Sequence, residues 1–366
     1  MEIATGSTDA PGSTGETPHY DLADFTFDLP PENIAQTPAE ERDQARLLVL
    51  DRRTGTMTHS RVARLSNFLQ PGDLLVFNDT RVLRARLYGK LATGGSIELL
   101  LVRPVRREDP QEWICLGRPG KRLRDGASIA LPGDTAAQVL ARLDDGMYAV
   151  RFDDRTNVFD FLASFGEMPL PPYIRRPDGP LPLDETRYQT VFAAHPGAIA
   201  APTAGLHFTT NLLEALRASG VESQQLTLHV GPGTFLPIRT GDYRSHIMDP
   251  EWCDIPETTA TAIRRAKADG RRVIAVGTTT TRALESSATG TADIVRSGSS
   301  WAGRFIVPGY RMQVVDALFT NFHLPGSTLL LLVAALIGRE TLLATYKEAI
   351  RLGYRFYSYG DAMLIQ

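Results

Sequence analysis

Residues 272–285 read RVIAVGTTTTRALE, and this stretch decides the fold class. Its first part is a short apolar run, which leads through a glycine and four threonines into a helical pattern. A buried strand that turns into a helix in this way is typical of an α/β sheet. Backbone N–H groups and hydroxyls at the carboxyl end of such a strand can hold a ribose or a carboxylate, so this turn is a candidate ligand site.

The same turn also has a purely structural interpretation. In that interpretation a threonine caps the helix, and Glu285 is an ordinary solvated helix residue. The stretch by itself leaves both interpretations open.

Outward from this stretch, strand and helix patterns alternate along the chain. We expect buried strands at residues 45–50, 226–230 and 305–307, and helices at 61–69, 256–268, 328–337 and 340–352. Ser327 or Thr328 is expected to cap the third of these helices.

The pattern differs between residues 73 and 152. Short strand-like runs, separated by Gly, Pro and Asp turn signals, occur at 73–77, 81–88, 97–102, 112–116, 127–131, 138–143 and 148–152. A small barrel is the natural way for such strands to close their edges. We therefore expect an α/β fold, with a discontinuous α/β catalytic domain at 19–68 and 156–366, an inserted small β-barrel domain at 69–155, and a disordered tail at 1–18.

Composition sets the broad class of the protein. The 366 residues are 43% hydrophobic and 22% charged, as in ordinary globular proteins. The longest apolar run, residues 329–337, is much shorter than the roughly 20 residues of a membrane span. With no leader pattern near Met1, we expect a cytoplasmic monomer without membrane association. Cys115 and Cys253 are far apart and are expected to be plain buried thiols.

Positive charge is concentrated in one segment. Residues 81–124 hold eleven basic and four acidic residues, a net charge of +7, although the whole chain has −3. Such a surface attracts polyanions such as nucleic acids. A solvated basic face without a partner explains the charge equally well.

Three histidines lie beside small turn residues at the ends of expected strands. They are His207 in AAPTAGLHF (200–208), His229 in LTLHVGPGTF (226–235) and His323 in NFHLPGST (321–328). With Asp316, they are candidates for proton transfer near neutral pH, and we expect all four to meet in one pocket with the turn at Thr278. The alternative is that they are hydrogen-bonded packing residues. Their spacing fits no zinc motif, and we expect no metal.

Taken together, the motifs resemble one family, the S-adenosylmethionine:tRNA ribosyltransferase-isomerases of queuosine biosynthesis. Besides the segments already quoted, the resemblance rests on PGDLLVFNDTRV (71–82), MPLPPYI (168–174), YQTVF (188–192), VVDALFTNFHLP (314–325) and YSYGDAM (357–363). It runs from Asp24 to the end of the chain, and the family's α/β domain with an inserted β-barrel agrees with the change of pattern described above.

The resemblance implies a reaction and its ligands. The family moves the ribosyl part of S-adenosylmethionine, a co-substrate, onto 7-aminomethyl-7-deazaguanine at the wobble position of tRNA. The products are epoxyqueuosine-tRNA, adenine and methionine, and no metal takes part. Such a site needs a base for a carbon-bound proton, an acid for adenine, and a carboxylate near the sulfonium.

These implications complete the candidate site. The catalytic candidates are His207, His229, Asp316, His323 and Asp79; the cofactor-binding candidates are Thr278, Thr279, Thr280, Arg282, Glu285 and Asn321; and the tRNA-binding candidates are Arg84, Arg86, Lys121, Arg122 and Arg124. For the last group, the structural alternative is that these cations form internal salt bridges with the acidic residues of their own segment.

The sequence departs from the family pattern at Asp249, where the family usually has histidine, which leaves His246 and Glu251 to be tested in that segment. Two other functions stay open at this point. One is an S-adenosylmethionine-dependent tRNA methyltransferase, which would release no adenine. The other is a non-catalytic RNA-binding module, which would not bind S-adenosylmethionine in the absence of RNA.

Overall fold

Four parallel strands form the centre of a nine-stranded sheet. They are β12 (Glu222–Leu228), β3 (Leu74–Asn78), β14 (Val273–Val276) and β16 (Ala317–Asn321), adjacent in that order. The computed structural model describes residues 20–106, 109–144, 146–235, 242–243, 246 and 248–366. The expected disordered tail at 1–18 lies outside the described residues.

Five further strands extend this sheet at its two sides. Beyond β12 lie β13 (Glu251–Ile255) and β15 (Gly298–Ala302); beyond β16 lie β17 (Ala362–Ile365), β1 (Arg46–Asp51) and β2 (Thr56–Arg61). The helices are α1 (Val158–Phe165), α2 (Pro182–Arg187), α3 (Thr210–Ala218), α4 (Glu257–Ala268), α5 (Thr278–Ser286), α6 (Thr328–Ile337) and α7 (Arg339–Arg351).

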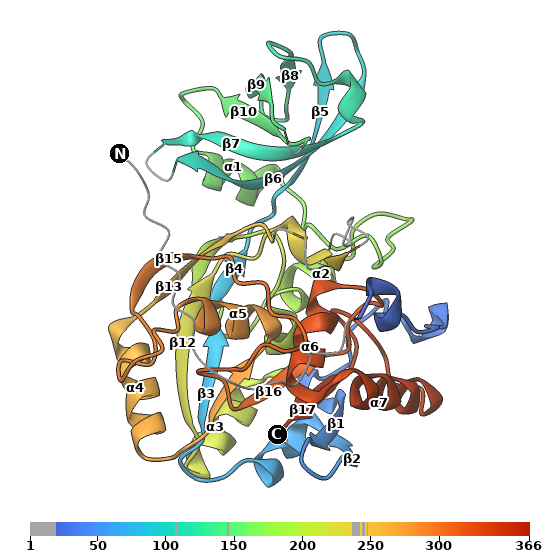
Figure 1. Ribbon diagram of the computed structural model, residues 1–366. Helices are drawn as coiled ribbons and strands as arrows, with labels where there is room; N and C mark the ends of the chain where they lie inside the picture. The colour runs from blue at the N-terminus through green and yellow to red at the C-terminus, as the bar shows by residue number, and fades with distance from the viewer. Residues whose placement is uncertain (1–19, 107–108, 145, 236–241, 244–245, 247) are drawn as a thin grey trace.

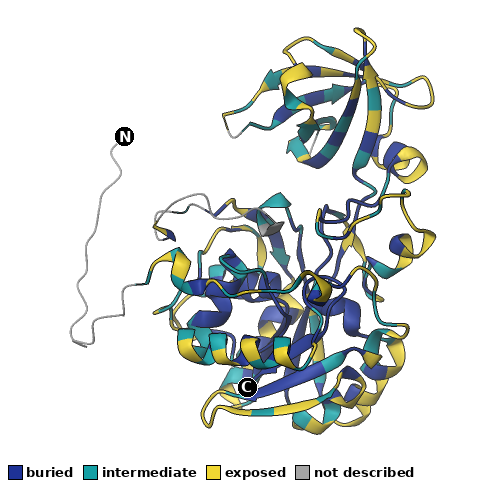
Figure 2. Cartoon of the chain, turned by 90° about the vertical axis from the view of Figure 1, so that its right-hand side faces the viewer, coloured by how far each residue is buried: buried dark blue, intermediate teal, exposed yellow. Residues whose placement is uncertain are grey.

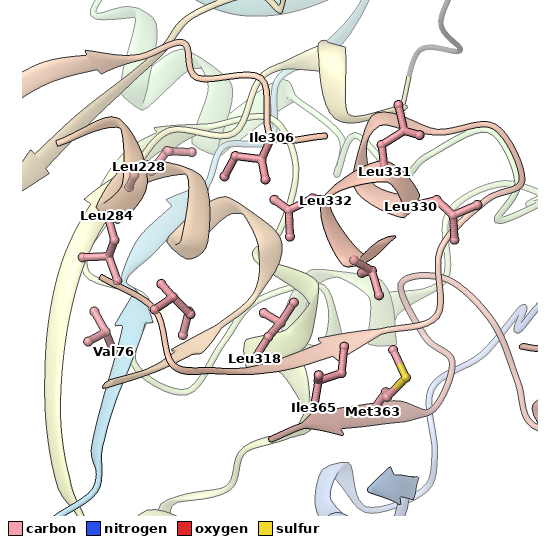
Figure 3. Close-up of a cluster of buried hydrophobic side chains, with 14 of the residues drawn as sticks. Val76, Leu228, Leu284, Ile306, Leu318, Leu330, Leu331, Leu332, Met363 and Ile365 are labelled. Carbon is pink, nitrogen blue, oxygen red and sulfur yellow. The ribbon is translucent and has the colours of Figure 1, made fainter. Parts of the chain in front are cut away.

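Alternating side chains bury both faces of the sheet. In β3, Leu74 and Val76 belong to one apolar cluster, and Leu75 and Phe77 belong to another on the opposite face. Figure 3 shows the first cluster, in which Leu284 of α5 and the leucines of α6 pack over the strands. This packing holds the two helices against one face of the sheet.

A separate six-stranded barrel lies beyond the carboxyl end of β3 (Figure 1). Its strands are β5 (Arg86–Leu91), β6 (Ser96–Arg106), β7 (Asp109–Arg118), β8 (Ser128–Ala130), β9 (Ala136–Arg142) and β10 (Tyr148–Phe152), and they close in the order β10-β7-β6-β5-β8-β9. Its interior is apolar, with Trp113 and Leu99 fully buried. Figure 2 shows exposed residues along the outside of the barrel and buried strands in the main sheet. The expected α/β fold with a small barrel is confirmed.

Two details of the expected organisation are wrong. Residues 73–77 were expected in the barrel, but β3 lies in the main sheet because all five of its residues are buried between two parallel neighbours. The barrel strands therefore begin at Arg86. The expected strand at 81–88 is also split: β4 (Thr80–Val82) pairs with β11 (His195–Ala198), and the chain crosses to the barrel before β5.

The expected strand at residues 305–307 is wrong as well. Ile306 is buried in the core, but as part of an irregular segment, and the nearby strand is β15. Pro308 follows directly and has no N–H group for strand pairing. The cap of α6 is Ser327, whose hydroxyl accepts a hydrogen bond from the Leu330 N–H at 3.2 Å.

Among the described residues, no helix taken singly has the length and apolar character to cross a membrane. Only α6 and α7 considered together, bent by 112° at their junction, reach that length and composition.

Candidate active site at the carboxyl edge of the sheet

The candidate residues of the central strands gather at one edge of the sheet. His229 follows β12, Asp79 follows β3, Thr278 begins the helix after β14, and Asn321 ends β16. Because these strands are parallel neighbours, their four carboxyl ends span only roughly 14 Å. Of the four residues expected to meet in one pocket with Thr278, only His323 lines the same pocket as Thr278.

A small pocket opens at this edge, which we call the threonine pocket. It is lined by Tyr173, Ala201, Pro202, Thr203, Ala204, Val230, Gly277, Thr278, Thr279, Thr320, Asn321, Phe322, His323, Leu324, Ser327, Leu329, Tyr357 and Ser358. Most of its wall is apolar or made of small residues, and its polar groups are hydroxyls, one amide and one imidazole. No carboxylate of the described residues lines it.

The amino end of α5 forms one side of the threonine pocket. Gly277 precedes the helix with a φ of 99°, a left-handed backbone that favours glycine. A helix N-terminus has free N–H groups and a partial positive charge, which suit oxygen atoms of a ligand. Thr278 and Thr279 lie in this first turn and line the pocket.

Asn321 presents an unsatisfied acceptor in the same pocket. Its Nδ2 lies 3.1 Å from His207 Nε2 and donates to the Tyr357 carbonyl at 3.1 Å. Its Oδ1 is buried and accepts no hydrogen bond from the described residues. A buried amide oxygen without a partner costs free energy, so it is a ready site for a ligand hydroxyl or amino group.

Burial strongly affects the protonation of His207 and His323. Burial lowers the pKa of each to about 3, and nearby Arg355 adds to the effect at His207. The charged form of both imidazoles is therefore disfavoured near pH 7, which counts against the expected proton exchange. His323 Nε2 lies 2.9 Å from Thr320 Oγ1, and His207 lies behind Asn321 rather than in the pocket wall. Both groups are suited to hydrogen bonding.

Two tyrosines cover the pocket from another side. The rings of Tyr173 and Tyr357 lie 4.6 Å apart, and the Tyr173 hydroxyl lies 2.7 Å from Ser358 Oγ. Tyr357 has a φ of 71°, which is unusual for a residue other than glycine and is typical of strained functional sites. Aromatic faces of this kind attract cations.

A larger cleft, which we call the interdomain cleft, lies between barrel and sheet. Its barrel side consists of Val102, Arg103, Pro104, Val105, Pro110, Trp113 and Met147, with Phe159 of α1; its sheet side consists of Pro196, Gly197, His229, Gly231, Pro232, Gly233, Met248, Asp249, Pro250, Glu251, Trp252, Arg282 and Trp301. Val230 lines the threonine pocket and Gly231 lines the cleft, so the two spaces adjoin at the end of β12.

His229 faces this cleft rather than the threonine pocket. Its Nδ1 lies 2.9 Å from Thr80 Oγ1, and its ring stacks on Trp252 at 4.9 Å. Gly197 is required opposite it, because a Cβ there would lie 2.5 Å from His229 Nε2. The imidazole is therefore fixed in position while it remains accessible from the cleft.

Arg282 also belongs to the cleft. Its guanidinium forms a buried ion pair with Glu251, at 2.9 Å between Nη1 and Oε2, and its Nε has no hydrogen-bond partner among the described residues. Glu251 Oε1 in turn accepts from the Gly231 N–H at 2.8 Å. Asp249, at the position of the usual family histidine, is exposed in the same cleft, and the His246 ring packs on Phe305.

Three expected site residues lie elsewhere. Asp316 precedes β16 instead of following it, so it lies at the opposite edge of the sheet and pairs with Lys267 at 2.7 Å. Glu285 is fully buried and accepts hydrogen bonds from Tyr310 and from the backbone of 313–315, which makes it neither a ligand residue nor a solvated one. Thr280 donates to the Val276 carbonyl at the end of β14.

Asp79 is at the expected edge but lines neither space. Its Oδ1 accepts from the Thr227 hydroxyl at 2.7 Å, and its Oδ2 lies 3.7 Å from His195 Nε2. Burial raises the pKa of its carboxyl. Through its hydrogen bond with Thr227, Asp79 links the end of β3 to β12.

The expected tRNA-binding cations divide into two groups. Arg84 donates to the Gly166 and Ala163 carbonyls, and Arg86 donates to the Leu170 carbonyl, so both connect the barrel to the segment that follows it. Arg86 also pairs with Glu98 of its own segment at 3.6 Å, as in the structural alternative, whereas Arg84 pairs with Glu185 outside that segment at 3.2 Å. Lys121, Arg122 and Arg124 are exposed around a short helical turn, and no ion pair involves them within the described ranges.

The structure also includes residues that the sequence analysis did not assign. Tyr173 and Tyr357 lie within quoted motifs, so a signal for them existed, whereas Trp301 lies in a segment poor in motifs. Cys115 and Cys253 are free and buried, as expected. Over the described part of the chain, no group of three or more potential ligands could hold a metal ion.

The neutral histidines predict how stability depends on pH. A histidine with a folded pKa of about 3 and an unfolded pKa of about 6.5 stabilises the fold fully above pH 6.5 and loses this contribution as pH falls toward 3. The free energy of unfolding should therefore fall by about 1.4 kcal/mol per pH unit for each such histidine. Urea unfolding of His323→Asn should show a smaller decrease than wild type between about pH 6 and about pH 4.

Thr320→Val is the control, because it removes the hydrogen bond of His323 without removing a titratable group. It should keep the wild-type dependence on pH. An unchanged slope in His323→Asn would contradict the neutral assignment.

Comparisons with known proteins identify the family of this chain. Residues 22–365 match the family described as queuosine biosynthesis protein. The S-adenosylmethionine:tRNA ribosyltransferase-isomerase of Citrifermentans bemidjiense is 51% identical over 94% of this chain and 99% of its own length. The relative of the same name from Gloeobacter violaceus is 49% identical over 93% and 94%.

A solved structure matches as well. The S-adenosylmethionine tRNA ribosyltransferase of Thermotoga maritima is 34% identical, with a TM-score of 0.52 over 94% of this chain and all of that one. A family match over nearly the whole described chain, with relatives half identical in sequence, shows that this chain belongs to the queuosine biosynthesis protein family.

Proposed function

We propose that this protein is an S-adenosylmethionine:tRNA ribosyltransferase-isomerase of queuosine biosynthesis. The observation that carries the proposal is the identity of about half of all residues with enzymes of that name, over nearly their whole length. The geometry agrees, since a small pocket with a few polar groups adjoins a wide cleft between two domains. The enzyme acts in the cytoplasm, as a monomer, on tRNA.

The proposed reaction uses S-adenosylmethionine as a ribosyl donor. The bond between ribose and adenine breaks, and the bond between C5′ and sulfur breaks. The aminomethyl nitrogen of 7-aminomethyl-7-deazaguanine loses a proton and forms one new bond to the sugar, and rearrangement within the sugar, with loss of a carbon-bound proton, forms the epoxide. Adenine and methionine leave, and epoxyqueuosine-tRNA remains. We propose that this chemistry needs no metal.

We assign S-adenosylmethionine to the threonine pocket. The first turn of α5 suits a carboxylate or ribose oxygens, and Asn321 Oδ1 suits a hydroxyl or an amino group. The rings of Tyr173 and Tyr357 offer aromatic faces to the sulfonium, which replaces the carboxylate expected at that place. The modified base then approaches from the interdomain cleft.

Proton transfer is assigned to His229. An effective acid or base has a pKa near the working pH, which disfavours His207 and His323. His229 lies at the boundary of pocket and cleft, with Nδ1 held by Thr80. Neutral His323 and His207 orient Thr320 and Asn321 instead.

The first prediction tests the reaction itself. Incubation with S-adenosylmethionine and tRNA that carries the aminomethyl base should release adenine in a one-to-one ratio with modified tRNA. Chromatography of adenine and mass analysis of the tRNA measure both products. A tRNA without the aminomethyl base is the control; equal adenine release from both RNAs, or methyl transfer without adenine, would count against ribosyl transfer.

A second prediction concerns His229. His229→Gln should lower kcat by about 10²- to 10⁴-fold, the usual contribution of a general acid or base, and leave the melting temperature near that of wild type. His59→Gln is the control, because His59 lies on β2 at the far side of the sheet. If His229→Gln lowers stability but keeps the specific rate, the histidine is a packing residue.

A third prediction concerns the exposed cations Lys121, Arg122 and Arg124, which we assign to phosphates of the anticodon stem-loop. Replacing all three by glutamate should weaken tRNA binding and leave S-adenosylmethionine binding unchanged. Each lost phosphate contact should reduce the slope of log affinity against log salt by about 0.7, so three should reduce it by about 2.

The matched control is the triple replacement of Arg64, Arg217 and Lys347 by glutamate. These residues are exposed on the α/β part and give the same change of charge. Equal loss of affinity in both variants would mean that net charge, and not this turn, sets RNA binding. Unchanged tRNA affinity in the variant of Lys121, Arg122 and Arg124 would mean that the RNA binds elsewhere on the protein.

A further inference from the structure

Three aromatic side chains form a row across neighbouring strands of the interdomain cleft. His229 follows β12, Trp252 lies in β13, and Trp301 lies in β15 directly opposite Trp252 in the antiparallel register. Paired residues of antiparallel strands point to the same face. His229 stacks on Trp252 with ring planes 25° apart, and all three side chains line the cleft.

The outer end of this row is unusually exposed. The Trp301 side chain is 55% exposed, the highest exposure among the large hydrophobic residues of the described chain. The Arg103 guanidinium of barrel strand β6 lies 6.0 Å from its ring centre. The row therefore ends at a contact between sheet and barrel, where an aromatic face and a cation remain accessible.

The charges around the row favour a base over a phosphate. Two basic residues, Arg103 and Arg282, line the cleft with two acidic ones, Asp249 and Glu251. Arg282 and Glu251 neutralise each other in a buried pair, and Asp249 is exposed. A nearly neutral, aromatic surface suits the π-face of a nucleobase, whereas phosphates need an excess of cations.

We infer that Trp301, with Arg103 beside it, stacks an unpaired nucleobase of the RNA loop next to the reacting base. The inference rests on the proposed function, which supplies the RNA. Unpaired bases that are turned outward are commonly bound by aromatic and arginine side chains. The row continues inward through Trp252 to His229. A base stacked on Trp301 therefore keeps the adjacent nucleotide of the RNA near His229, the proposed proton-transfer residue.

The test compares Trp301→Leu with Trp301→Phe in binding an unmodified anticodon stem-loop RNA. One lost stacking contact should weaken affinity by about 5- to 100-fold in Trp301→Leu, and Trp301→Phe should retain most of the affinity. The slope of affinity against salt should not change, since no phosphate contact is removed. S-adenosylmethionine binding should also stay the same. Trp301 is exposed at an edge strand, so both variants should keep the wild-type melting temperature.

Tyr88→Leu is the matched control, because Tyr88 is an aromatic residue with 49% exposure on the barrel outside the cleft. Wild-type affinity in Trp301→Leu, an equal loss in Trp301→Phe or in Tyr88→Leu, or a loss of S-adenosylmethionine binding would each overturn the inference. Adenine release by wild type separates the two claims: if release is coupled to tRNA modification while Trp301→Leu binds normally, the inference fails and the proposed function stands.

Discussion

The turn at Gly277 fixes the geometry on which the rest of the site depends. With a φ of 99°, it lets β14 pass into α5 without an intervening loop, so the first turn of the helix directly faces the threonine pocket. The other end of α5 is held by Glu285, whose carboxylate accepts from the backbone of the segment leading into β16. The helix that supplies the pocket and the strand that supplies Asn321 are thereby locked together.

The place of insertion explains why a second space exists. The chain leaves the sheet at the carboxyl end of β3, where ligands of α/β sheets usually bind, and builds the barrel there. Arg84 and Arg86 then donate to backbone carbonyls on the return segment, which ties the barrel to the edge it covers. A wide cleft beside a small pocket is what a macromolecular and a small-molecule substrate would need together.

The sequence predicted the fold well, because buried strands, glycine turns and short barrel strands have strong local signals. It predicted the site less well, because the role of a side chain depends on the direction in which it points and on how far it is buried. Asp316 directly precedes β16 and Asn321 ends it, so the two residues lie only five positions apart, yet they occupy opposite edges of the sheet. Glu285 resembles a surface residue in the pattern of its helix, but a loop distant in sequence covers it. Likewise, only the packed structure shows that burial lowers the pKa of His207 and His323.

The orientation of the His229 imidazole depends on its neighbours. Thr80, which holds its Nδ1, belongs to the strand leading to the barrel, and Trp252, on which its ring stacks, belongs to the aromatic row of the cleft. A shift of the barrel or the binding of a base against the row would therefore move the contacts that orient this imidazole. Because Gly197 leaves no room for a Cβ beside the ring, the position is narrowly defined. In the proposed enzyme, the binding of RNA would thereby affect the orientation of the His229 imidazole, the proposed proton-transfer group.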